Sequence, residues 1–470
     1  MALERGMKNP VDPLSPEEFT QSFAEIQPPF APQEAVVEAN RCLFCFDAPC
    51  TTACPTHIDV PRFIKKITSG NLRGSALTIL ESNILGSSCA RVCPVEVLCE
   101  GACVMRGYNK QPIEIGRLQR HAMDWFYEHG AQLPAPRTVP GRQVACIGGG
   151  PASLACAAEL RRHGLAVTIF EGRRMAGGLN TYGIAEYKLR PPDSLREVEL
   201  VRSFGVRFRL GVEIGSDVSL EALEEEFHAV FVGVGLGPTQ TLRAPGEELS
   251  GVVDAVRFIA EYKTETPAVG HRVVVIGGGN TAIDAATAAR RLGAMEVSIL
   301  YRRGEKQMPA FHYEYELAKQ DGIRFYWLTQ PVAIHGKDAV ESVECVRMEL
   351  GPADHTGRRR PQPVSGSNFH IPCDMVITSI GQSRLIEFLR RCRGIELHEG
   401  RVAVNPATGQ TANPRYFAGG DCVNGGREVV DAVAEGARAG RGIVRWFESL
   451  GGAGANGLDG PGAIPRGAAS

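Results

Sequence analysis

The chain has 470 residues, of which 43% are hydrophobic and 22% are charged, and its formal net charge is −2. These values are typical of a globular protein of about three domains, and they give no basic field that would attract nucleic acid or an anionic membrane. No apolar stretch reaches the ~18 residues that cross a bilayer, and the N-terminus lacks the apolar segment of a secretory signal. We therefore expect a cytoplasmic protein with no nucleic-acid or membrane partner.

The first 135 residues predict a helical domain. Residues 1–30 are polar and contain prolines, which indicates an extended or loosely packed arm. Beyond the arm, apolar spacing predicts helices over residues 60–67, 74–80 and 115–127, separated by cysteine-bearing loops. A proline-rich linker at residues 132–141 marks the C-terminal boundary of this domain.

Cysteine is concentrated in this domain, because eight of the 14 cysteines fall between residues 42 and 103. They form two groups, Cys42-x2-Cys45-x4-Cys50-x3-Cys54-Pro55 and Cys89-x3-Cys93-Pro94-x4-Cys99-x3-Cys103. In a long chain without an export signal, such groups predict metal ligation rather than disulfides. Thiolates at loop spacing followed by proline suit [4Fe–4S] clusters, whereas zinc, the alternative, cannot relay electrons. Eight thiols suffice for two clusters, but spacing alone does not assign them. The other six cysteines are isolated, and we expect them to be buried as small apolar side chains.

After the linker, short β-branched runs alternate with alanine-rich segments, which predicts parallel α/β units. The first unit has a strand at residues 143–147, the glycine turn Gly148-Gly149-Gly150-Pro151-Ala152-Ser153, a helix at 154–163 and a strand at 166–170 that ends in Glu171. This order is the dinucleotide-binding pattern, in which the turn approaches a diphosphate at the helix N-terminus and the acid binds the ribose. The ordinary alternative is a glycine turn in an unrelated α/β unit.

A second unit repeats the pattern. The turn Gly277-Gly278-Gly279-Asn280-Thr281-Ala282 follows a strand and precedes a helix at residues 285–292. Its next strand, at residues 296–300, is followed by Tyr301-Arg302-Arg303 instead of an acid. Guanidinium groups suit the 2′-phosphate of NADP, so the pattern favours NADPH, with NADH possible. Two arginines at an exposed strand end are the ordinary alternative.

A third segment completes the predicted architecture. Residues 375–381 and 416–421 look like a return to the first α/β domain, and Gly419-Gly420-Asp421 precedes a helix over residues 429–438 whose N-terminus would face a flavin. A simple strand–turn–helix cap is the alternative. We predict a helical domain at 1–135, an FAD-binding domain at 142–250 and 375–450, an inserted NAD(P)H-binding domain at 251–374, and a disordered tail at 451–470.

Along about residues 35–450 the chain resembles the flavin-containing subunit of bacterial dihydropyrimidine dehydrogenase, with the glutamate synthase small subunit as the next relative. The resemblance is carried by the two cysteine groups, by Ile113-Glu-Ile-Gly-Arg-Leu-Gln119 and by Gly150-Pro-Ala-Ser153. It implies an α-helical iron–sulfur domain followed by two Rossmann-like α/β nucleotide-binding domains, for FAD and NADPH, with the NADPH domain inserted in the FAD domain.

The resemblance also implies site residues. One [4Fe–4S] cluster would be held by Cys42, Cys45, Cys50 and Cys103, and the other by Cys54, Cys93, Cys99 and Gln119, which leaves Cys89 free. The implied FAD positions are Gly148, Gly149, Gly150, Pro151, Ala152, Glu171, Gly178, Leu179, Lys188, Ile214, Gly420, Asp421, Glu428 and Val429. Lys188 departs from the arginine that is frequent in the family. The implied NADP positions are Gly278, Gly279, Asn280, Thr281, Arg302, Arg303 and Lys306.

From these features we expect an electron-input subunit that takes hydride from NADPH onto FAD and passes single electrons through two [4Fe–4S] clusters. Hydride transfer between stacked rings needs no acid, base or nucleophile from the chain, so we predict no catalytic residue. The electrons would reach a partner FMN/iron–sulfur catalytic subunit, in a hetero-oligomer that reduces uracil or thymine to the 5,6-dihydropyrimidine. The alternatives are a glutamate synthase small subunit, another NADPH:acceptor oxidoreductase, and a redox-silent scaffold.

Overall fold

The computed structural model describes residues 10–136, 141–265, 267–355 and 357–450. They divide into two compact units. The smaller unit comprises residues 10–26, 182–187 and 237–383, and the larger unit comprises residues 27–181, 188–236 and 384–450. The predicted tail at 451–470 lies outside the described residues. No helix in the described ranges is both long and apolar enough to cross a membrane.

The larger unit begins with a layer of short helices. Its members are α2 (Pro32–Asn40), α3 (Pro49–Ala53), α4 (Val60–Thr68), α5 (Leu72–Ser82), α6 (Gly86–Val92), the 3-10 turn η1 (Val104–Tyr108) and α7 (Ile115–Glu128). The predicted helices at 60–67, 74–80 and 115–127 are confirmed as α4, α5 and α7. Side-chain caps fix two of the starts, because the Asp59 side chain accepts from Arg62 N and that of Asn71 accepts from Gly74 N.

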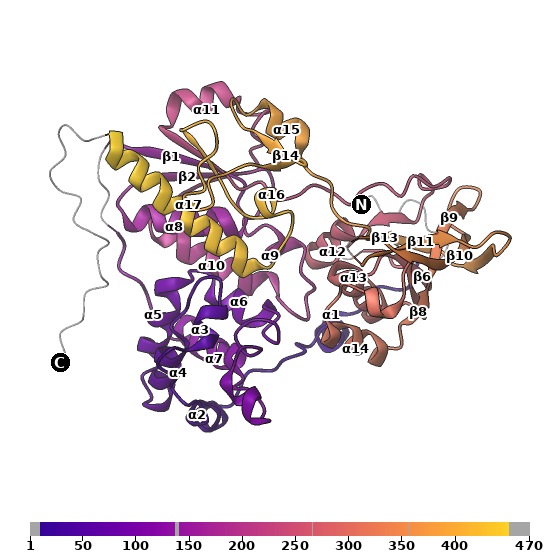
Figure 1. Cartoon of the computed structure of the whole chain (residues 1–470), viewed down its shortest axis with the longest axis horizontal. Coiled ribbons are helices and arrows are strands. Elements are labelled where there is room, and N and C mark those ends of the chain that lie inside the picture. Colours follow the sequence, from indigo (N-terminus) through magenta and orange to yellow (C-terminus); the bar gives the residue numbers. More distant parts are fainter. Residues whose placement is uncertain (1–9, 137–140, 266, 356, 451–470) are drawn as a thin grey trace. The chain divides into compact units, whose positions relative to one another are not determined.

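A parallel five-stranded sheet follows in the same unit, in the order β16-β4-β1-β2-β3. Its strands are β1 (Gln143–Ile147), β2 (Ala166–Glu171), β3 (Arg207–Leu210), β4 (Ala229–Val232) and β16 (Tyr416–Ala418). The accompanying elements are α8 (Pro151–Arg162), α9 (Leu179–Tyr182), α10 (Pro191–Ser203), α11 (Leu220–Glu226), α15 (Ile386–Arg391), β14 (Leu397–His398), β15 (Arg401–Val402), α16 (Asp421–Asn424) and α17 (Val429–Leu450). The long helix α17 runs along α8 (Figure 1).

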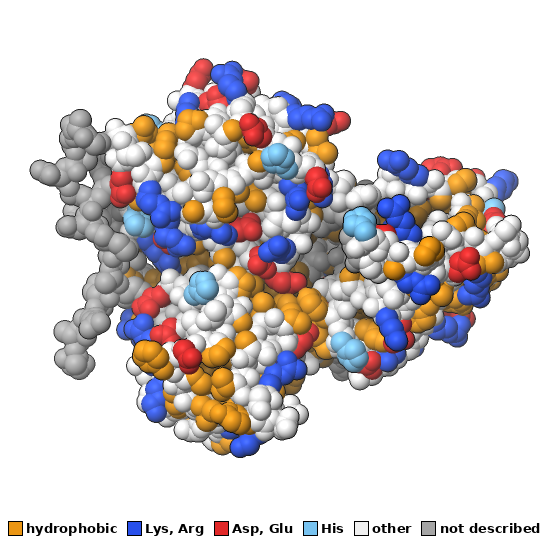
Figure 2. Space-filling view, viewed as in Figure 1, with side chains coloured by type: hydrophobic (Ala, Val, Ile, Leu, Met, Phe, Trp, Pro, Cys, Tyr) orange, Lys and Arg blue, Asp and Glu red, His pale blue; other side chains and the backbone are white. Residues whose placement is uncertain are grey.

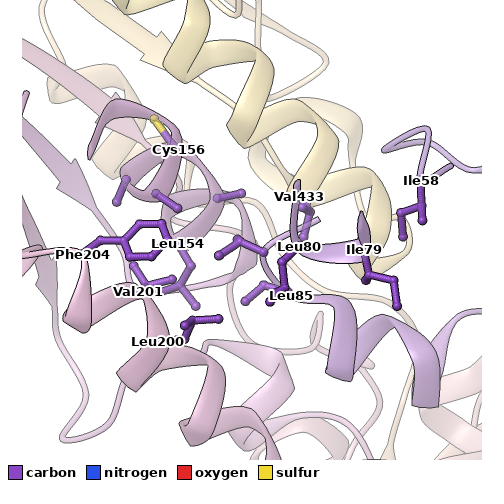
Figure 3. Close-up of a cluster of buried hydrophobic side chains, with 14 of the residues drawn as sticks. Ile58, Ile79, Leu80, Leu85, Leu154, Cys156, Leu200, Val201, Phe204 and Val433 are labelled. Atoms are coloured by element: carbon purple, nitrogen blue, oxygen red, sulfur yellow. The ribbon is translucent and has the colours of Figure 1, made fainter. Parts of the chain in front are cut away.

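One hydrophobic core joins the helical layer to this sheet. Ile79, Leu80 and Leu85 from the helical layer lie in the same buried cluster as Leu154 of α8 and Val201 of α10 (Figure 3). The cysteine-bearing helices and the helix that follows the first glycine turn therefore share one continuous core.

The smaller unit contains a second parallel sheet, in the order β5-β13-β6-β7-β8. Its strands are β5 (Val252–Asp254), β6 (Arg272–Ile276), β7 (Glu296–Tyr301), β8 (Arg324–Trp327) and β13 (Met375–Thr378). Its helical elements are α1 (Pro16–Ser22), α12 (Ala255–Thr264), α13 (Asn280–Arg291), η2 (Glu305–Gln307) and α14 (His312–Gln320). An antiparallel sheet adds β9 (Thr329–His335), β10 (Ser342–Ala353), β11 (Arg359–Pro363) and β12 (Phe369–Pro372).

The structure corrects the predicted boundaries of the inserted domain. Residues 375–381 were expected to return to the first sheet, but β13 pairs with β5 and β6 in the second sheet. The connecting segments also pair with each other, since Gly237 N donates to Ser383 O at 2.9 Å and Thr239 forms a bridge with Gln382. The inserted body therefore spans residues 237–383, which is wider than the predicted 251–374.

The N-terminal arm also differs from its prediction. Residues 10–26 belong to the smaller unit and not to the helical layer. Val11 N donates to Val269 O at 2.7 Å, and the ring of Phe23 lies 4.4 Å from Phe19 and 5.3 Å from Tyr262. Because Phe23 is buried, the described part of the arm is packed and not loose; residues 1–9 lie outside the described ranges.

Candidate functional site

The first group of thiols comes from two segments that lie far apart in the chain. Cys42, Cys45, Cys50 and Cys103 line one pocket, together with aliphatic side chains from α4 and from residues 104–115. Burial is the main cause that raises the pKa of the Cys50 thiol to about 11, and its neighbours Cys42 and Cys103 raise it further. The pKa of Cys42 is raised in the same way, by burial and then by Cys45 and Cys103. The four sulfurs therefore face one another in an apolar setting.

A second group of thiols forms around Cys93, at the end of α6. A side-chain hydrogen bond with Cys89 is the first cause that raises the pKa of Cys93, followed by burial and by the nearby Cys99 and Cys54. The pKa of Cys99 is raised by burial, then by Glu100 and Cys54. The thiols of Cys54, Cys93 and Cys99 thus share one neighbourhood, with Cys89 against Cys93, and their assignment to one cluster with Gln119 stays a prediction. The contact between Cys89 and Cys93 was not predicted.

Gln119 lies on α7, against the helix that leads to Cys93. A Cβ atom at Gly116, one turn earlier, would lie 3.2 Å from Val95 Cγ1 and 3.4 Å from Ala90 O, so this face of α7 covers residues 90–95. The Gln119 side chain is buried, and its Nε2 donates to Gly86 O at 2.7 Å. Within the described chain that is its one hydrogen bond, which leaves the amide oxygen available to coordinate a metal.

The separation of the sulfurs favours a multi-iron cluster over zinc. Sulfurs on one tetrahedral zinc lie about 3.8 Å apart, given Zn–S bonds of about 2.3 Å. Among the described residues, no three cysteine sulfurs lie within 4.8 Å of one another. Thiolates that each bind a different iron of a [4Fe–4S] cluster are spaced more widely than ligands of a single ion. Soft thiols gathered in an apolar pocket are the donor type that iron–sulfur clusters use, so these donors fit such a cluster.

The first glycine turn has the geometry of a dinucleotide site. Gly148 has φ +91°, and a Cβ there would lie 2.6 Å from Gly233 O, so only glycine fits. Gly150 caps the N-terminus of α8, and a Cβ at Gly178 would lie 2.8 Å from the Gly150 Cα. Glu171 accepts from Gly149 N at 2.7 Å. Two backbone segments and a carboxylate thus meet at the start of α8.

The third glycine turn meets the first. Gly420 has φ +78°, and its N–H donates to Glu435 Oε2 at 2.7 Å. A Cβ at Gly420 would lie 3.0 Å from the Cβ of Ala152 and 3.7 Å from that of Ala432. The N-terminal turns of α8 and α17 therefore converge, and two helix N-termini at one point favour an anionic diphosphate.

The remaining predicted FAD residues lie on several elements of the larger unit. Asp421 opens α16, and burial raises the pKa of its carboxyl to about 6, against a hydrogen bond from Arg427 N. Leu179 opens α9, Val429 opens α17 directly after Glu428, and Ile214 and Lys188 are buried. Pro151 is the first residue of α8, where its missing N–H costs no hydrogen bond.

The second glycine turn has the same geometry in the smaller unit. Gly277 has φ +149°, and a Cβ on it would lie 2.1 Å from Ser379 O. Gly279 caps α13 and has no atom within 4 Å of its Cβ position, which leaves room for a ligand. Asn280 Oδ1 accepts from Phe311 N at 3.0 Å, so the start of the helix, where Thr281 follows, is tied to the loop after β7. A Cβ at Gly278 would contact the ring of Tyr301.

The predicted phosphate-binding cations occupy different environments. Arg302 and Lys306 are exposed, and neither forms a hydrogen bond or an ion pair within the described residues. Arg303 is half-buried, and its guanidinium donates to Arg359 O of β11 at 3.3 Å. The two free cations at the end of β7 are thus Arg302 and Lys306, whereas Arg303 is partly used within the protein. Whether any of the three binds a phosphate stays a prediction.

Sequence reasoning missed a buried carboxylate that contacts α6, the helix that leads to Cys93. Glu197 of α10 is fully buried and accepts from Ser87 N at 2.7 Å, from Ser88 N at 3.0 Å and from the Ser88 hydroxyl. Asp193 lies one turn earlier on the same buried face. The sequence signal that could have found this site is the pair of acidic residues Asp193 and Glu197, which lie four positions apart on the buried face of α10. All six isolated cysteines are buried, as predicted.

Comparisons with known proteins agree with this arrangement. Residues 19–131 match the family described as dihydropyrimidine dehydrogenase domain II, 4Fe-4S cluster, and residues 142–436 match the pyridine nucleotide-disulphide oxidoreductase family. The chain is 38% identical over 447 residues to the NADPH glutamate synthase small chain of Halomonas elongata, covering 91% of this chain and 94% of the relative. The corresponding protein of Escherichia coli is 37% identical, with the same coverage. The chain belongs to the glutamate synthase small-subunit superfamily.

Other relatives of the chain carry names that specify different functions. The beta subunit of the NADP+-dependent formate dehydrogenase of Moorella thermoacetica is 37% identical and is covered over 59% of its length. FprA of Mycobacterium tuberculosis in complex with NADPH has a similar fold, with a TM-score of 0.55 at 23% identity over 66% of this chain and 85% of that chain. A helical iron–sulfur domain followed by a flavin and pyridine-nucleotide fold is thus confirmed, and the chain is an oxidoreductase of that type.

Proposed function

We propose that this chain is the electron-input subunit of a dihydropyrimidine dehydrogenase-type enzyme. It takes hydride from NADPH on a bound FAD and passes single electrons through two bound [4Fe–4S] clusters to a partner subunit with FMN and iron–sulfur centres, which reduces uracil or thymine. The observation that carries the proposal is Gln119, a buried amide on the face of α7 that covers residues 90–95, whose oxygen forms no hydrogen bond among the described residues. An amide in place of a thiolate makes a cluster less negative and so changes its potential.

The residues of the chain bind and orient the groups, and bound FAD and iron–sulfur clusters would supply the hydride and one-electron chemistry. The converging starts of α8 and α17 would provide N–H groups for the FAD diphosphate, and the Glu171 carboxylate, which accepts from Gly149 N, would also accept hydrogen bonds from ribose hydroxyls. In the smaller unit, the start of α13 would bind the nucleotide diphosphate, and Arg302 with Lys306 would bind a 2′-phosphate.

We infer that the partner binds beside the first thiol group. The helical layer of the larger unit carries a set of exposed large apolar side chains, namely Val36, Val37, Leu43, Phe46, Val97 and Tyr108. Phe46 is 105% exposed and directly follows Cys45, and Leu43 directly follows Cys42. Apolar side chains also gather on the face of this layer that is turned to the viewer in Figure 2. Exposed apolar groups of this kind typify protein interfaces, so we infer that electrons leave the chain there.

The full-length relatives favour a second candidate. Two NADPH glutamate synthase small chains are 37–38% identical to this chain over 91% of its length. In that case the partner would be a glutamate-forming subunit. The superfamily is common to both candidates, so they differ only in the partner that receives the electrons.

The test begins with the native complex, purified anaerobically through a tag on this chain. We expect flavin absorbance, more than eight iron atoms per copy of this chain (about eight in its own two [4Fe–4S] clusters and the rest in the partner), and NADPH-dependent loss of uracil or thymine. NADPH oxidation that requires glutamine and 2-oxoglutarate would instead establish the second candidate. Zinc in place of iron would contradict both.

The role of Gln119 is tested on the same protein. Gln119→Ala removes the amide oxygen, and we expect a changed electron paramagnetic resonance signal and a shifted potential for one cluster only, with the FAD content unchanged. Gln119→Glu keeps an oxygen donor and adds a charge, so its cluster should assemble with a lower potential. Identical signals in wild type and Gln119→Ala would show that Gln119 is not a ligand.

A further inference from the structure

Three metal-binding side chains meet on the antiparallel sheet of the smaller unit, away from the cysteine groups in the sequence. They are His335 at the end of β9, Glu344 on β10 and His370 on β12. Their donor atoms all lie within 4.8 Å of one another. His335 Nε2 lies 2.9 Å from Glu344 Oε2, and the rings of His335 and His370 are 5.2 Å apart.

The strand register explains why these three side chains share one face. β10 lies between β9 and β12, and Glu344 is paired directly with His370 of β12. On the other side Glu344 is paired with Ala333, and Ser342 is paired with His335. Side chains two residues apart lie on the same face of a strand, so His335 is the diagonal neighbour of Glu344. The sheet thus holds the three donors in position by backbone pairing.

A fourth residue orients the carboxylate. Asn368 Nδ2 donates to Glu344 Oε1 at 2.6 Å, which leaves Oε2 toward His335. Metal-binding carboxylates are typically held by a hydrogen bond to their second oxygen in this way.

We propose that His335, Glu344 and His370 form a site for one divalent first-row metal ion, zinc in the cell, with water in the remaining position. Two imidazoles and one carboxylate are a known zinc donor set, with bonds of about 2.0–2.2 Å. Donors on one tetrahedral zinc lie about 3.3–3.5 Å apart, so rotation of exposed imidazoles is enough to close the site. Nitrogen donors favour zinc over magnesium or calcium, which prefer oxygen.

The bound ion would cross-link three strands of the antiparallel sheet. It would join β9, β10 and β12 by side chains in addition to their backbone hydrogen bonds. β12 leads directly into β13, and Ser379 just beyond β13 abuts the nucleotide turn at Gly277. Metal binding should therefore raise the unfolding temperature of the smaller unit. Without an ion, the same residues form an ordinary histidine–carboxylate hydrogen bond.

The experiment uses the anaerobically purified, untagged, iron-loaded protein, so that the cysteines are occupied. The protein is treated with a mild chelator, equilibrated with micromolar zinc chloride and desalted, and zinc and iron are then measured in the same sample. We expect one zinc per chain in wild type and none in the double variant His335→Gln/His370→Gln, with equal iron in both. Zinc should raise the thermal midpoint of wild type only, and crystals should show anomalous density at the zinc edge beside Glu344.

A matched control is present in the same unit. His312 and Glu316 form an exposed pair at 3.7 Å on α14, but they have no third donor among the described residues. His312→Gln should therefore keep the zinc content and the thermal shift of wild type. Equal zinc content in wild type and in the double variant, or zinc that is lost from wild type on desalting, would overturn the proposal.

Discussion

Gly436 lies where α17 crosses the first turn of α8. A Cβ at this position would lie 2.0 Å from Ala152 O, which belongs to the turn that we assign to the FAD diphosphate. Gly436→Ala must therefore push the two helix N-termini apart, at a cost of about 1–3 kcal/mol for an overpacked contact. We expect the variant to lose FAD on desalting, measured as the ratio of flavin to protein absorbance.

The control for this variant lies on the same helix. Ala437 is half-buried, and Ala437→Ser adds one atom at a position about 100° around the helix axis from Gly436. It should retain FAD as wild type does. Equal flavin loss in both variants would indicate a general weakening of α17 rather than a defect at the convergence of the two turns.

Arg302 is a free cation at the end of β7, whereas Arg303 already donates to Arg359 O. Hydrogen bonds to a charged group contribute about 1.5–3 kcal/mol. Arg302→Ala should therefore raise the KM for NADPH by about 10- to 100-fold and leave the KM for NADH unchanged, in steady-state assays with an artificial acceptor. Arg303→Ala should have the smaller effect. A parallel rise of both KM values would contradict phosphate recognition by Arg302.

At the scale of elements, α10 is tied to α6 by one carboxylate. Glu197 accepts from the backbone of Ser87 and Ser88, and the neighbouring Gly86 O accepts from Gln119. Glu197 thus fixes the turn that positions the amide of Gln119. Burial is the main cause that raises the pKa of this carboxyl to about 7, against the hydrogen bonds that lower it.

This pKa predicts how stability depends on pH. The folded value of about 7 lies above the usual 4.5, so between these values the folded chain holds a proton that the unfolded chain has released. The contribution of Glu197 to stability therefore falls as pH rises through this window. The amide of Glu197→Gln cannot titrate and can keep the hydrogen bonds. The thermal midpoint of the variant, relative to that of wild type, should therefore rise as the pH is raised from 5 to 8.

The exposed Glu199 on the same helix provides the comparison. The difference between Glu199→Gln and wild type should not change over this range. If the difference in thermal midpoint between Glu197→Gln and wild type is also constant with pH, the buried carboxyl does not change its protonation in the folded chain over this range.

Helices and strands were predictable from the sequence where the pattern that specifies them lies within one continuous segment. The amphipathic spacing at residues 60–67 and 115–127 located α4 and α7 to within one residue at each end. Residues 375–381 were expected to return to the first α/β domain, but the apolar run of β13 does not specify which sheet it joins. That choice is made by pairing with β5 and β6, which are more than 95 residues away in sequence. The prediction for the N-terminal arm was wrong for the same reason, because Tyr262, which Phe23 contacts, is distant from the arm in sequence.

The candidate functional site was likewise predictable only where its residues are adjacent in sequence. The glycine turns were predictable because strand, turn and helix are adjacent in sequence. The grouping of Cys103 with Cys42 was not derivable from spacing and came from the family resemblance, whereas the structure brings the two thiols into one pocket. The three donors His335, Glu344 and His370 show no motif, because they lie on separate strands.

At the scale of the whole molecule, each buried core lies within one unit. Two clusters fall within the smaller unit and two within the larger. Units with separate cores open separately, so a ligand bound to one stabilises that one. We therefore expect NADP+ at 100 times its Kd to stabilise the smaller unit by about 2.7 kcal/mol, slowing hydrogen exchange of its most protected amides by about 100-fold.

Hydrogen–deuterium exchange with mass spectrometry of the FAD-loaded protein measures this directly. Added NADP+ should protect peptides of β6, α13 and the loop at residues 302–311, and it should leave α8 and α17 unchanged. The variant Arg302→Ala, at the same NADP+ concentration, should lose most of the protection. Protection that extends equally into α8 and α17 would show that the two units open as one body, because separate cores cannot share the free energy of binding at one site.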